Sequence, residues 1–174
     1  MLRLYQKLQA LQAQVLEAAE DASDLDLLGR LMLRTSARNQ LHGKVVAIAS
    51  QGRNDLIRLE LAEGLVIDAQ ITHDSTLRLE LESGIEVVAL IKAGWLDLLG
   101  PEDDPTPGNN CLTGVIEEIL DAEDGPSEVR IGLPNGQTLC ALAEPLHLRS
   151  RGLAKGKAVR VQFAPSNVLL GTPL

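Results

Sequence analysis

Residues 39–48 read NQLHGKVVAI, and residues 110–119 read NCLTGVIEEI. The two stretches share an asparagine, a glycine and three aliphatic positions at a constant offset of 71 residues: Asn39/Asn110, Leu41/Leu112, Gly43/Gly114, Val45/Ile116 and Ile48/Ile119. Repetition of this kind indicates a duplicated structural unit. Shared glycines mark shared turns or close approaches, and shared apolar positions mark a shared core, so we expect both units to fold alike.

The correspondence continues after one inserted residue, at an offset of 72. It covers Ile57/Val129, Leu59/Ile131, Leu61/Leu133, Gly64/Gly136, Ala69/Ala141, Leu81/Leu153, Gly84/Gly156 and Val87/Val159. Extended runs punctuated by glycine predict strands in the first unit. These runs are residues 44–50, 56–61, 65–71 and 86–92. Residues 72–81 lose the alternation, which predicts a turn or one short helix there.

These patterns predict a mainly β protein in which a helical segment precedes two small barrels. The stretch GPEDDPTPGNN at 100–110 contains three prolines and predicts a linker. The expected divisions are a helical lead at 1–34, a first barrel at 35–99, a linker at 100–109 and a second barrel at 110–174. A barrel of about 65 residues is only marginally stable alone, so the two should pack together or against a second chain.

The helical lead carries apolar residues in a 4-3-4-3-4 spacing. They are Leu4, Leu8, Leu11, Val15, Ala18 and Ala22. A helix of about 21 residues with this heptad stripe is marginal in water unless the stripe is covered. The narrow stripe indicates dimerisation with a second copy, and a helix docked on its own domain is the alternative.

The composition restricts the classes of function. The 174 residues carry a net charge of −8 and three aromatic side chains, Tyr5, Trp95 and Phe163. Nucleic acids are held by Lys and Arg, and single strands also by aromatic platforms, so neither kind of binding is expected. The absence of a long apolar run or a signal peptide predicts a cytoplasmic protein. The two cysteines, Cys111 and Cys140, are interpreted as buried free thiols.

A duplicated unit can be compared with itself, so polar residues found in one copy become candidates for chemistry. The serine and arginine of TSARNQ (35–40) are absent from TPGNNC in the second copy. The hydroxyls of ITHDS (71–75) are absent from AEPLH, and the lysine of IKA (91–93) is absent from FAP. The donors confined to the first copy are Ser36, Arg38, Thr72, Ser75 and Lys92.

All five side chains donate hydrogen bonds, two are cationic, and none is an efficient general base at neutral pH. This inventory suits a multiply charged oxyanion, because charge-assisted N–H and O–H donors offset the loss of its hydration. Lys92 ends an otherwise apolar strand, where an ammonium is either a solvated edge charge or an anion ligand. Its disappearance together with Arg38 and the hydroxyls favours the anion ligand.

At these residues the sequence resembles the molybdate-binding Mop domain, a five-stranded barrel of the TOBE type related to the oligonucleotide/oligosaccharide-binding (OB) fold. The resemblance rests on TSARNQLHGKV at 35–45, ITHDSTLRLELESG at 71–84 and VVALIKA at 87–93. The paired copies resemble the di-Mop arrangement of molbindins and of the effector half of ModE-type molybdate-responsive transcriptional regulators. The stretch NGQTLCA at 135–141 and the helical lead at 5–21 are more similar to the regulators.

The resemblance implies a cytoplasmic homodimer of tandem OB-like five-stranded barrels that binds molybdate, and tungstate as well, at sites between subunits. It implies no direct bond from a protein side chain to the metal, and no membrane partner. The implied oxyanion ligands are Ser36, Arg38, Thr72, Ser75 and Lys92, with the backbone N–H groups of Ala37 and Ala93. The second copy departs from the pattern at every charged position. The winged helix-turn-helix of the regulators has no counterpart in this sequence, so no direct DNA binding is expected of it.

These residues agree with some functions better than with others. The leading prediction is the oxyanion-sensing effector domain of a ModE-type molybdenum-dependent transcriptional regulator, in which the ligand neutralises cationic groups and favours one dimer geometry. The alternative is a molbindin-like protein for molybdate storage or buffering. A ligand-free accessory barrel leaves the loss of five donors unexplained. An enzyme is not expected, because the three histidines share no metal-ligand spacing and no nucleophile or phosphate-loop motif occurs.

Overall fold

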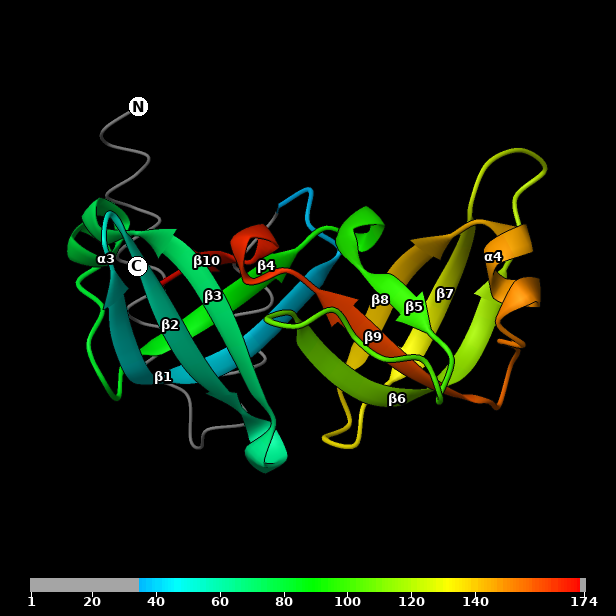
Figure 1. Ribbon diagram of the computed structural model, residues 1–174, viewed down its shortest axis with the longest axis horizontal. Helices are drawn as coiled ribbons and strands as arrows, with labels where there is room; N and C mark the ends of the chain where they lie inside the picture. The colour runs from blue at the N-terminus through cyan, green and yellow to red at the C-terminus, as the bar shows by residue number, and fades with distance from the viewer. Residues whose placement is uncertain (1–34, 173–174) are drawn as a thin grey trace, which may run out of the picture.

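The protein is described by a computed structural model that covers residues 35–172. The helical lead predicted for residues 1–34, with its dimerisation stripe, lies outside these residues. Figure 1 shows two β-barrels side by side, one built mainly from each repeat. Each barrel contains a five-stranded antiparallel sheet, which confirms the predicted fold class.

The two halves of the chain contain the same elements in the same order. The N-terminal half comprises β1 (Asn39–Gln51), β2 (Asn54–Leu61), the 3-10 turn η1 (Ala62–Gly64), β3 (Val66–Thr72), α3 (His73–Arg78), β4 (Glu86–Ile91), η2 (Ala93–Trp95) and β5 (Asp97–Leu99). The C-terminal half comprises β6 (Asn110–Leu120), β7 (Ser127–Gly132), β8 (Thr138–Ala143), α4 (Pro145–Ser150), β9 (Ala158–Phe163), η3 (Pro165–Asn167) and β10 (Leu169–Gly171). The predicted strands and the short helix after residue 72 are confirmed.

The repeated glycine of the first strand is required by a close approach of the neighbouring strand. A Cβ atom on Gly43 would lie 2.9 Å from the carbonyl oxygen of Glu60. At the equivalent position, a Cβ atom on Gly114 would lie 2.6 Å from the carbonyl oxygen of Gly132. Real side chains do not tolerate such contacts with backbone, so glycine is kept in both repeats for packing rather than for function.

The fifth strand of each barrel comes from the other repeat, a feature that the sequence did not predict. In the first sheet the strand order is β10-β4-β1-β2-β3, and in the second it is β5-β9-β6-β7-β8. Leu169 of β10 pairs with Leu90, and Leu98 of β5 pairs with Val161. Each repeat therefore needs the other to complete its sheet, in the manner of a domain swap within one chain.

Two asparagines related by the repeat also join the barrels. Asn39 is 2% exposed; its Nδ2 donates to the carbonyl oxygens of Ile91 (3.1 Å) and Cys140 (2.9 Å), and its Oδ1 accepts from the Cys140 N–H (2.7 Å). Asn110 makes the equivalent pair of bonds to the backbone of Asp68, at 2.7 and 2.8 Å. Cys140 and Asp68 lie on β8 and β3, the edge strands of the two sheets. Each side-chain amide therefore satisfies backbone groups of the opposite barrel's edge strand.

Aliphatic side chains fill both barrels, as the scarcity of aromatic residues predicts. In the first barrel Leu41, Ile57 and Ile67 are at most 1% exposed, and in the second Ile131 and Leu139 are fully buried. Each buried side chain of this size contributes roughly 1.5–3 kcal/mol relative to an exposed one.

Asn39→Ala should lower the free energy of unfolding by about 3 kcal/mol, because three buried backbone groups lose their partner. Urea unfolding followed by circular dichroism measures this loss. The matched control is Asn109→Ala, because Asn109 donates one long side-chain bond, 3.4 Å to Gln162 Oε1. We expect the control to cost less than about 1 kcal/mol. Equal losses in the two variants would show that the Asn39 bonds do not hold the barrels together.

Candidate functional site

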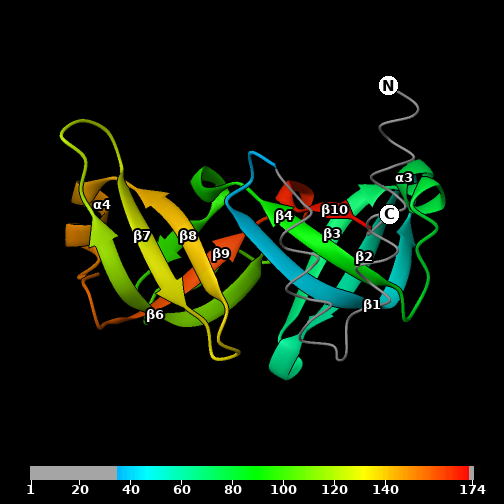
Figure 2. The ribbon, with the colours of Figure 1, turned by 180° about the vertical axis from the view of Figure 1, so that it is seen from behind.

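Five of the seven predicted ligand residues gather where the barrels meet. We call them the junction cluster: Ser36, Ala37, Arg38, Lys92 and Ala93. The first three lead into β1 and the last two follow β4. Asn39 pairs with Ile91 in the antiparallel register, so the residues just outside this pair face each other. Figure 2 shows the start of β1 at the junction, where it approaches β8 of the second barrel.

Lys92 is exposed and stacks on the sole tryptophan. Its Nζ lies 5.0 Å from the centroid of the Trp95 ring, a distance at which a cation is attracted by the ring face. Ala93 is buried and opens the 3-10 turn η2 that places this ring. The backbone N–H of Ala37, a predicted anion donor, donates to the Thr35 hydroxyl at 2.9 Å.

Arg38 reaches across the junction to a carboxylate of the second barrel. Its Nη2 donates to Glu128 Oε1 at 2.6 Å, and the side chains of the two residues are 55% and 19% exposed. Glu128 lies on β7 and also contacts Arg130 at 3.5 Å. The hydrogen bond that Arg38 donates to Glu128 raises the pKa of Arg38 above its ordinary value. Within residues 35–172 this is the one ion pair of Arg38, so most of its five donors remain available to a ligand.

The thiol of Cys140 completes the surroundings of Glu128. Cys140 Sγ donates to Glu128 Oε1 at 3.3 Å. This hydrogen bond, followed by the one from Arg38, lowers the pKa of Glu128. Burial, and then the hydrogen bond with Glu128, raises the pKa of Cys140 to about 11. Both cysteines are free, Cys140 buried and Cys111 half-buried, so Cys140 matches the predicted buried thiol.

The remaining two predicted ligands, Thr72 and Ser75, form what we call the α3 cluster. Thr72 is the N-cap of α3: its Oγ1 accepts from the Ser75 N–H at 3.1 Å and lies 2.8 Å from Ser75 Oγ. Arg78 adds a cation that sequence reasoning did not single out, because its Nη2 donates to Ser75 Oγ at 3.3 Å. Two hydroxyls and a guanidinium therefore lie together along the short helix α3.

The two clusters occupy opposite ends of the first barrel. Gln51, the last residue of β1, pairs with Asn54, and Asn54 pairs with Thr72. The junction cluster adjoins the other end of β1, at Asn39. This strand of 13 residues follows a path of roughly 40 Å at about 3.3 Å per residue. Figure 1 shows α3 at the outer end of the barrel, away from the junction. One chain therefore does not bring all seven residues together.

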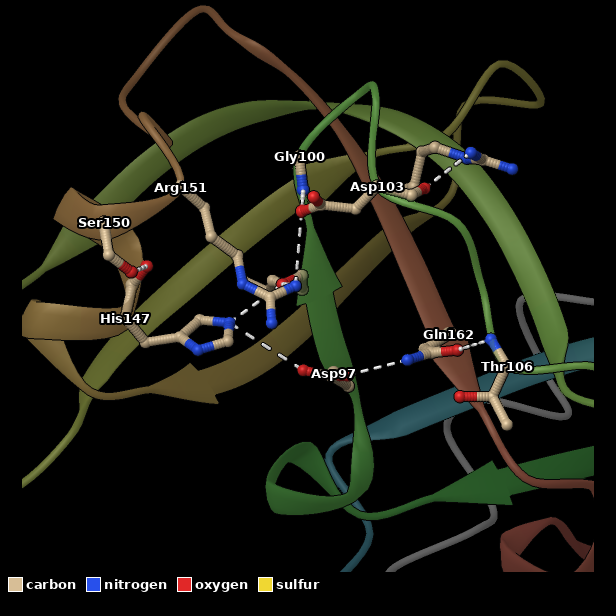
Figure 3. Close-up of polar contacts among 10 residues, drawn as sticks. Asp97, Gly100, Asp103, Thr106, His147, Ser150, Arg151 and Gln162 are labelled. Carbon is tan, nitrogen blue, oxygen red and sulfur yellow. Dashed lines mark hydrogen bonds and ion pairs between the residues drawn. The ribbon is translucent and has the colours of Figure 1, made fainter.

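In the second barrel, residues at and near the positions equivalent to the α3 cluster bind β5, the strand that comes from the first repeat. His147 stands where the first repeat has Ser75, and its Nε2 donates to the Leu98 carbonyl oxygen at 2.9 Å (Figure 3). Arg151 Nη1 donates to the same oxygen at 3.3 Å. Glu144 replaces Thr72 and lines an open pocket of about 250 Å³ beside β5. A carboxylate there disfavours an anion.

Sequence reasoning missed Glu128 for an identifiable reason. The comparison of repeats searched for polar residues that the first copy has and the second lacks. The equivalent of Glu128 in the first repeat is Leu56, so the reverse comparison would have found it. The partnership with Arg38 itself follows from the packing of the barrels and has no local sequence signal.

The fold defines a class of protein: a tandem pair of OB-like five-stranded barrels, each of which takes its fifth strand from the other repeat. The TOBE domain family matches residues 35–98 and 106–170, one match for each repeat. The chain belongs to this family. Within residues 35–172, no helix combines the length and apolarity needed to cross a membrane, and no three His, Cys, Asp or Glu side chains are grouped to hold a metal ion.

Relatives and a solved structure share most of this chain. The transcriptional regulator ModE of Yersinia pestis is 33% identical over 178 residues, which cover 99% of this chain and 67% of the relative. The molybdenum-pterin-binding protein MopA of Rhodobacter capsulatus is 33% identical over 165 residues, 91% of this chain and 61% of the relative. The crystal structure of the cytoplasmic molybdate-binding protein ModG with molybdate bound superposes with a TM-score of 0.77 at 30% identity, and covers 81% of this chain and 100% of that one.

The lowered pKa of Glu128 predicts a contribution to acid sensitivity. A carboxyl whose pKa is lower in the folded state stabilises the fold above its unfolded pKa, and this stabilisation is lost as the pH falls through the folded pKa. The melting temperature of the unaltered protein should therefore decrease as the pH is lowered past about 4. The melting temperature of Glu128→Gln should decrease less over the same pH range. Glu123→Gln, at an exposed position, is the control and should behave like the unaltered protein. A Glu128→Gln profile that matches the control would contradict the assignment.

Proposed function

We propose that this chain binds molybdate, and tungstate of the same shape and charge, at a site completed by two copies of the chain. The observation that carries the proposal is the division of the candidate ligands. The junction cluster supplies Arg38 and Lys92, and the α3 cluster supplies Thr72 and Ser75, at the opposite end of the barrel. A two-fold dimer that sets one end against the other makes two equivalent complete sites.

The chemistry of the site is binding without proton transfer. The guanidinium of Arg38 and the ammonium of Lys92 neutralise the dianion. The hydroxyls of Thr72 and Ser75, with the serine of the junction cluster, donate to its oxygens. Oxygen atoms of the ligand, and not the metal, face the protein. Arg38 already contacts Glu128 through one nitrogen, so the anion binds through its remaining donors or displaces the carboxylate.

The family relationship supports the choice of anion and the regulatory role. The relatives include ModE and MopA, and ModG was crystallised with molybdate. The match to ModE extends over 99% of this chain and so includes most of the predicted helical lead. Because that lead resembles the regulators, we prefer the oxyanion-sensing effector portion of a ModE-type regulator over storage or buffering. ModG is described as cytoplasmic, and we assign the same compartment to this homodimer.

Arg38→Ala and Lys92→Ala should each weaken molybdate binding about tenfold to a hundredfold, since a charged hydrogen bond contributes about 1.5–3 kcal/mol. Trp95 fluorescence reports the titration, because the Lys92 ammonium lies 5.0 Å from the ring centroid. Isothermal calorimetry gives the dissociation constant independently.

Lysines of the second repeat provide the matched control for this titration. Lys155→Ala and Lys157→Ala remove exposed ammonium groups of the second barrel and should leave the affinity nearly unchanged. Tungstate should bind like molybdate, with sulfate and phosphate as the comparison anions. The proposed function would be refuted if molybdate produced neither heat nor a fluorescence change with the unaltered protein. Equal losses of affinity from the second-repeat lysines would show that the assignment of the site to the first barrel is wrong.

Mixing two variants with weakened binding should restore high affinity if the site is shared between copies. Arg38→Ala disables the junction cluster, and Ser75→Ala disables the α3 cluster. A dimer with one copy of each has one intact site and one doubly damaged site. After the two variants are unfolded together and refolded, calorimetry should find about one high-affinity site for every heterodimer. No recovery on mixing would mean that each chain builds its site alone.

A further inference from the structure

A buried carboxylate in the first barrel holds the residue between the two parts of the α3 cluster. Asp55 lies on β2, and its side chain is 2% exposed. Its Oδ2 accepts a hydrogen bond from His73 Nδ1 at 2.9 Å. His73 directly follows Thr72, and its ring is 55% exposed, so the pair runs from the barrel interior to the surface beside Thr72 and Ser75.

Burial of the Asp55 carboxylate lowers the stability of the folded state, and the fold does not require the Asp55–His73 pair. Burying a charged group is unfavourable unless hydrogen bonds compensate, and one oxygen of Asp55, Oδ1, has no partner of good geometry within residues 35–172. The hydroxyl of Thr76, and then the His73 ring, lower the pKa of Asp55, so it is ionised at neutral pH. In the structure the Thr76 hydroxyl donates a long bond, 3.4 Å, to the Thr72 carbonyl oxygen.

The second repeat builds the same turn without this pair. Ser127 occupies the position of Asp55, is fully buried, and donates to Asp121 at 2.7 Å. Pro145 occupies the position of His73 at the start of α4. The barrel therefore folds with a neutral serine and a proline at these positions. A hydrogen-bonded carboxylate and imidazole kept only in the repeat that carries the candidate ligands indicate a role in the site rather than in the scaffold.

The contacts of Asp55 and His73 fix the position of the first residue of α3. The His73 backbone N–H donates to the Arg53 carbonyl oxygen at 2.8 Å, and its ring is held by Asp55, so the first residue of α3 is attached at two points. Thr72 and Ser75 flank this residue and bond to each other. Rotation of the turn would move both hydroxyls together, and a ligand held by several groups is sensitive to such small displacements.

We propose that Asp55 and His73 are positioning residues of the oxyanion site, which hold the α3 cluster in the orientation that binds the anion. The proposal rests on the proposed function, since it assigns no new ligand. The carboxylate acts through the His73 ring and does not touch the anion, whose charge it would repel. Asp74 and Arg78, which lie 3.7 Å apart, are further charged groups near the turn, and Arg78 also donates to Ser75.

The first test substitutes the pair and measures molybdate binding by calorimetry. Asp55→Ser introduces the residue that the second barrel already accommodates, so the fold should be retained. We expect Asp55→Ser and His73→Ala to weaken binding about tenfold, the lower end of what supporting residues contribute at ion sites. His73→Asn places an amide N–H near the position of Nδ1 and should recover most of the affinity. Failure of His73→Asn to bind better than His73→Ala would refute the hydrogen-bond role.

A matched control separates positioning from general damage. Ser127→Ala removes the equivalent buried side chain of the second barrel together with its 2.7 Å bond to Asp121. This variant should lower the melting temperature and leave the dissociation constant of molybdate unchanged. A loss of affinity in Ser127→Ala as large as that in Asp55→Ser would mean that both act through stability alone.

Mixing experiments then assign Asp55 to one cluster. If Asp55 supports the α3 cluster, Asp55→Ser mixed with Arg38→Ala should restore one high-affinity site for every heterodimer. Asp55→Ser mixed with Ser75→Ala should restore none, because both variants damage the same cluster. The opposite pattern would overturn the inference. An unaltered protein that does not bind molybdate would refute the proposed function instead, whereas normal binding by Asp55→Ser would refute only the positioning role.

Discussion

The rest of the structure depends on the exchange of the fifth strands between the two barrels. Hydrogen bonds from Asn39 and Asn110 to the opposite barrel stabilise this exchange. β5 and β10 each complete the sheet of the opposite barrel, and Asn39 bonds to the backbone of Cys140 across the junction. The same asparagine is the first residue of β1 and contacts the last residue of β4. Arg38 and Lys92 extend from these two strand ends. Their positions are therefore set by the second barrel as much as by the first.

Duplication explains how one barrel became a support for the other. Both repeats keep what the fold requires, such as Gly43 and Gly114 against a neighbouring carbonyl oxygen. Elsewhere they have diverged in complementary ways. The second barrel supplies Glu128 to Arg38, while its His147 binds the exchanged strand at the position where the first repeat has Ser75. The first barrel keeps the candidate cations and hydroxyls, and the second holds Arg38 through Glu128.

The sequence predicted what local patterns determine. Glycine-punctuated alternation located the strands, and the comparison of repeats selected the candidate ligands without a structure. It did not predict the exchange, because β5 and β10 have three residues each, too few to carry a pattern that selects one barrel over the other. It also did not reveal that Arg38 and Lys92 lie far from Thr72, because that depends on pairing register. Asp55 lies in phase with the buried residues Ile57 and Leu59 of the same strand, but the predicted strand began at Leu56 and therefore left Asp55 out.

A chain with a net charge of −8 can still bind a dianion, because only nearby charges act strongly. At physiological ionic strength exposed charges more than about 8 Å apart are largely screened, so the contacts of Arg38 and Lys92 outweigh distant carboxylates. Glu128 is the exception, since it touches Arg38 at 2.6 Å. Under the proposed function, the anion therefore competes with an internal carboxylate and also joins two copies. Ligand binding and dimer formation then strengthen each other by mass action, and a protein with this linkage responds to both oxyanion and protein concentration.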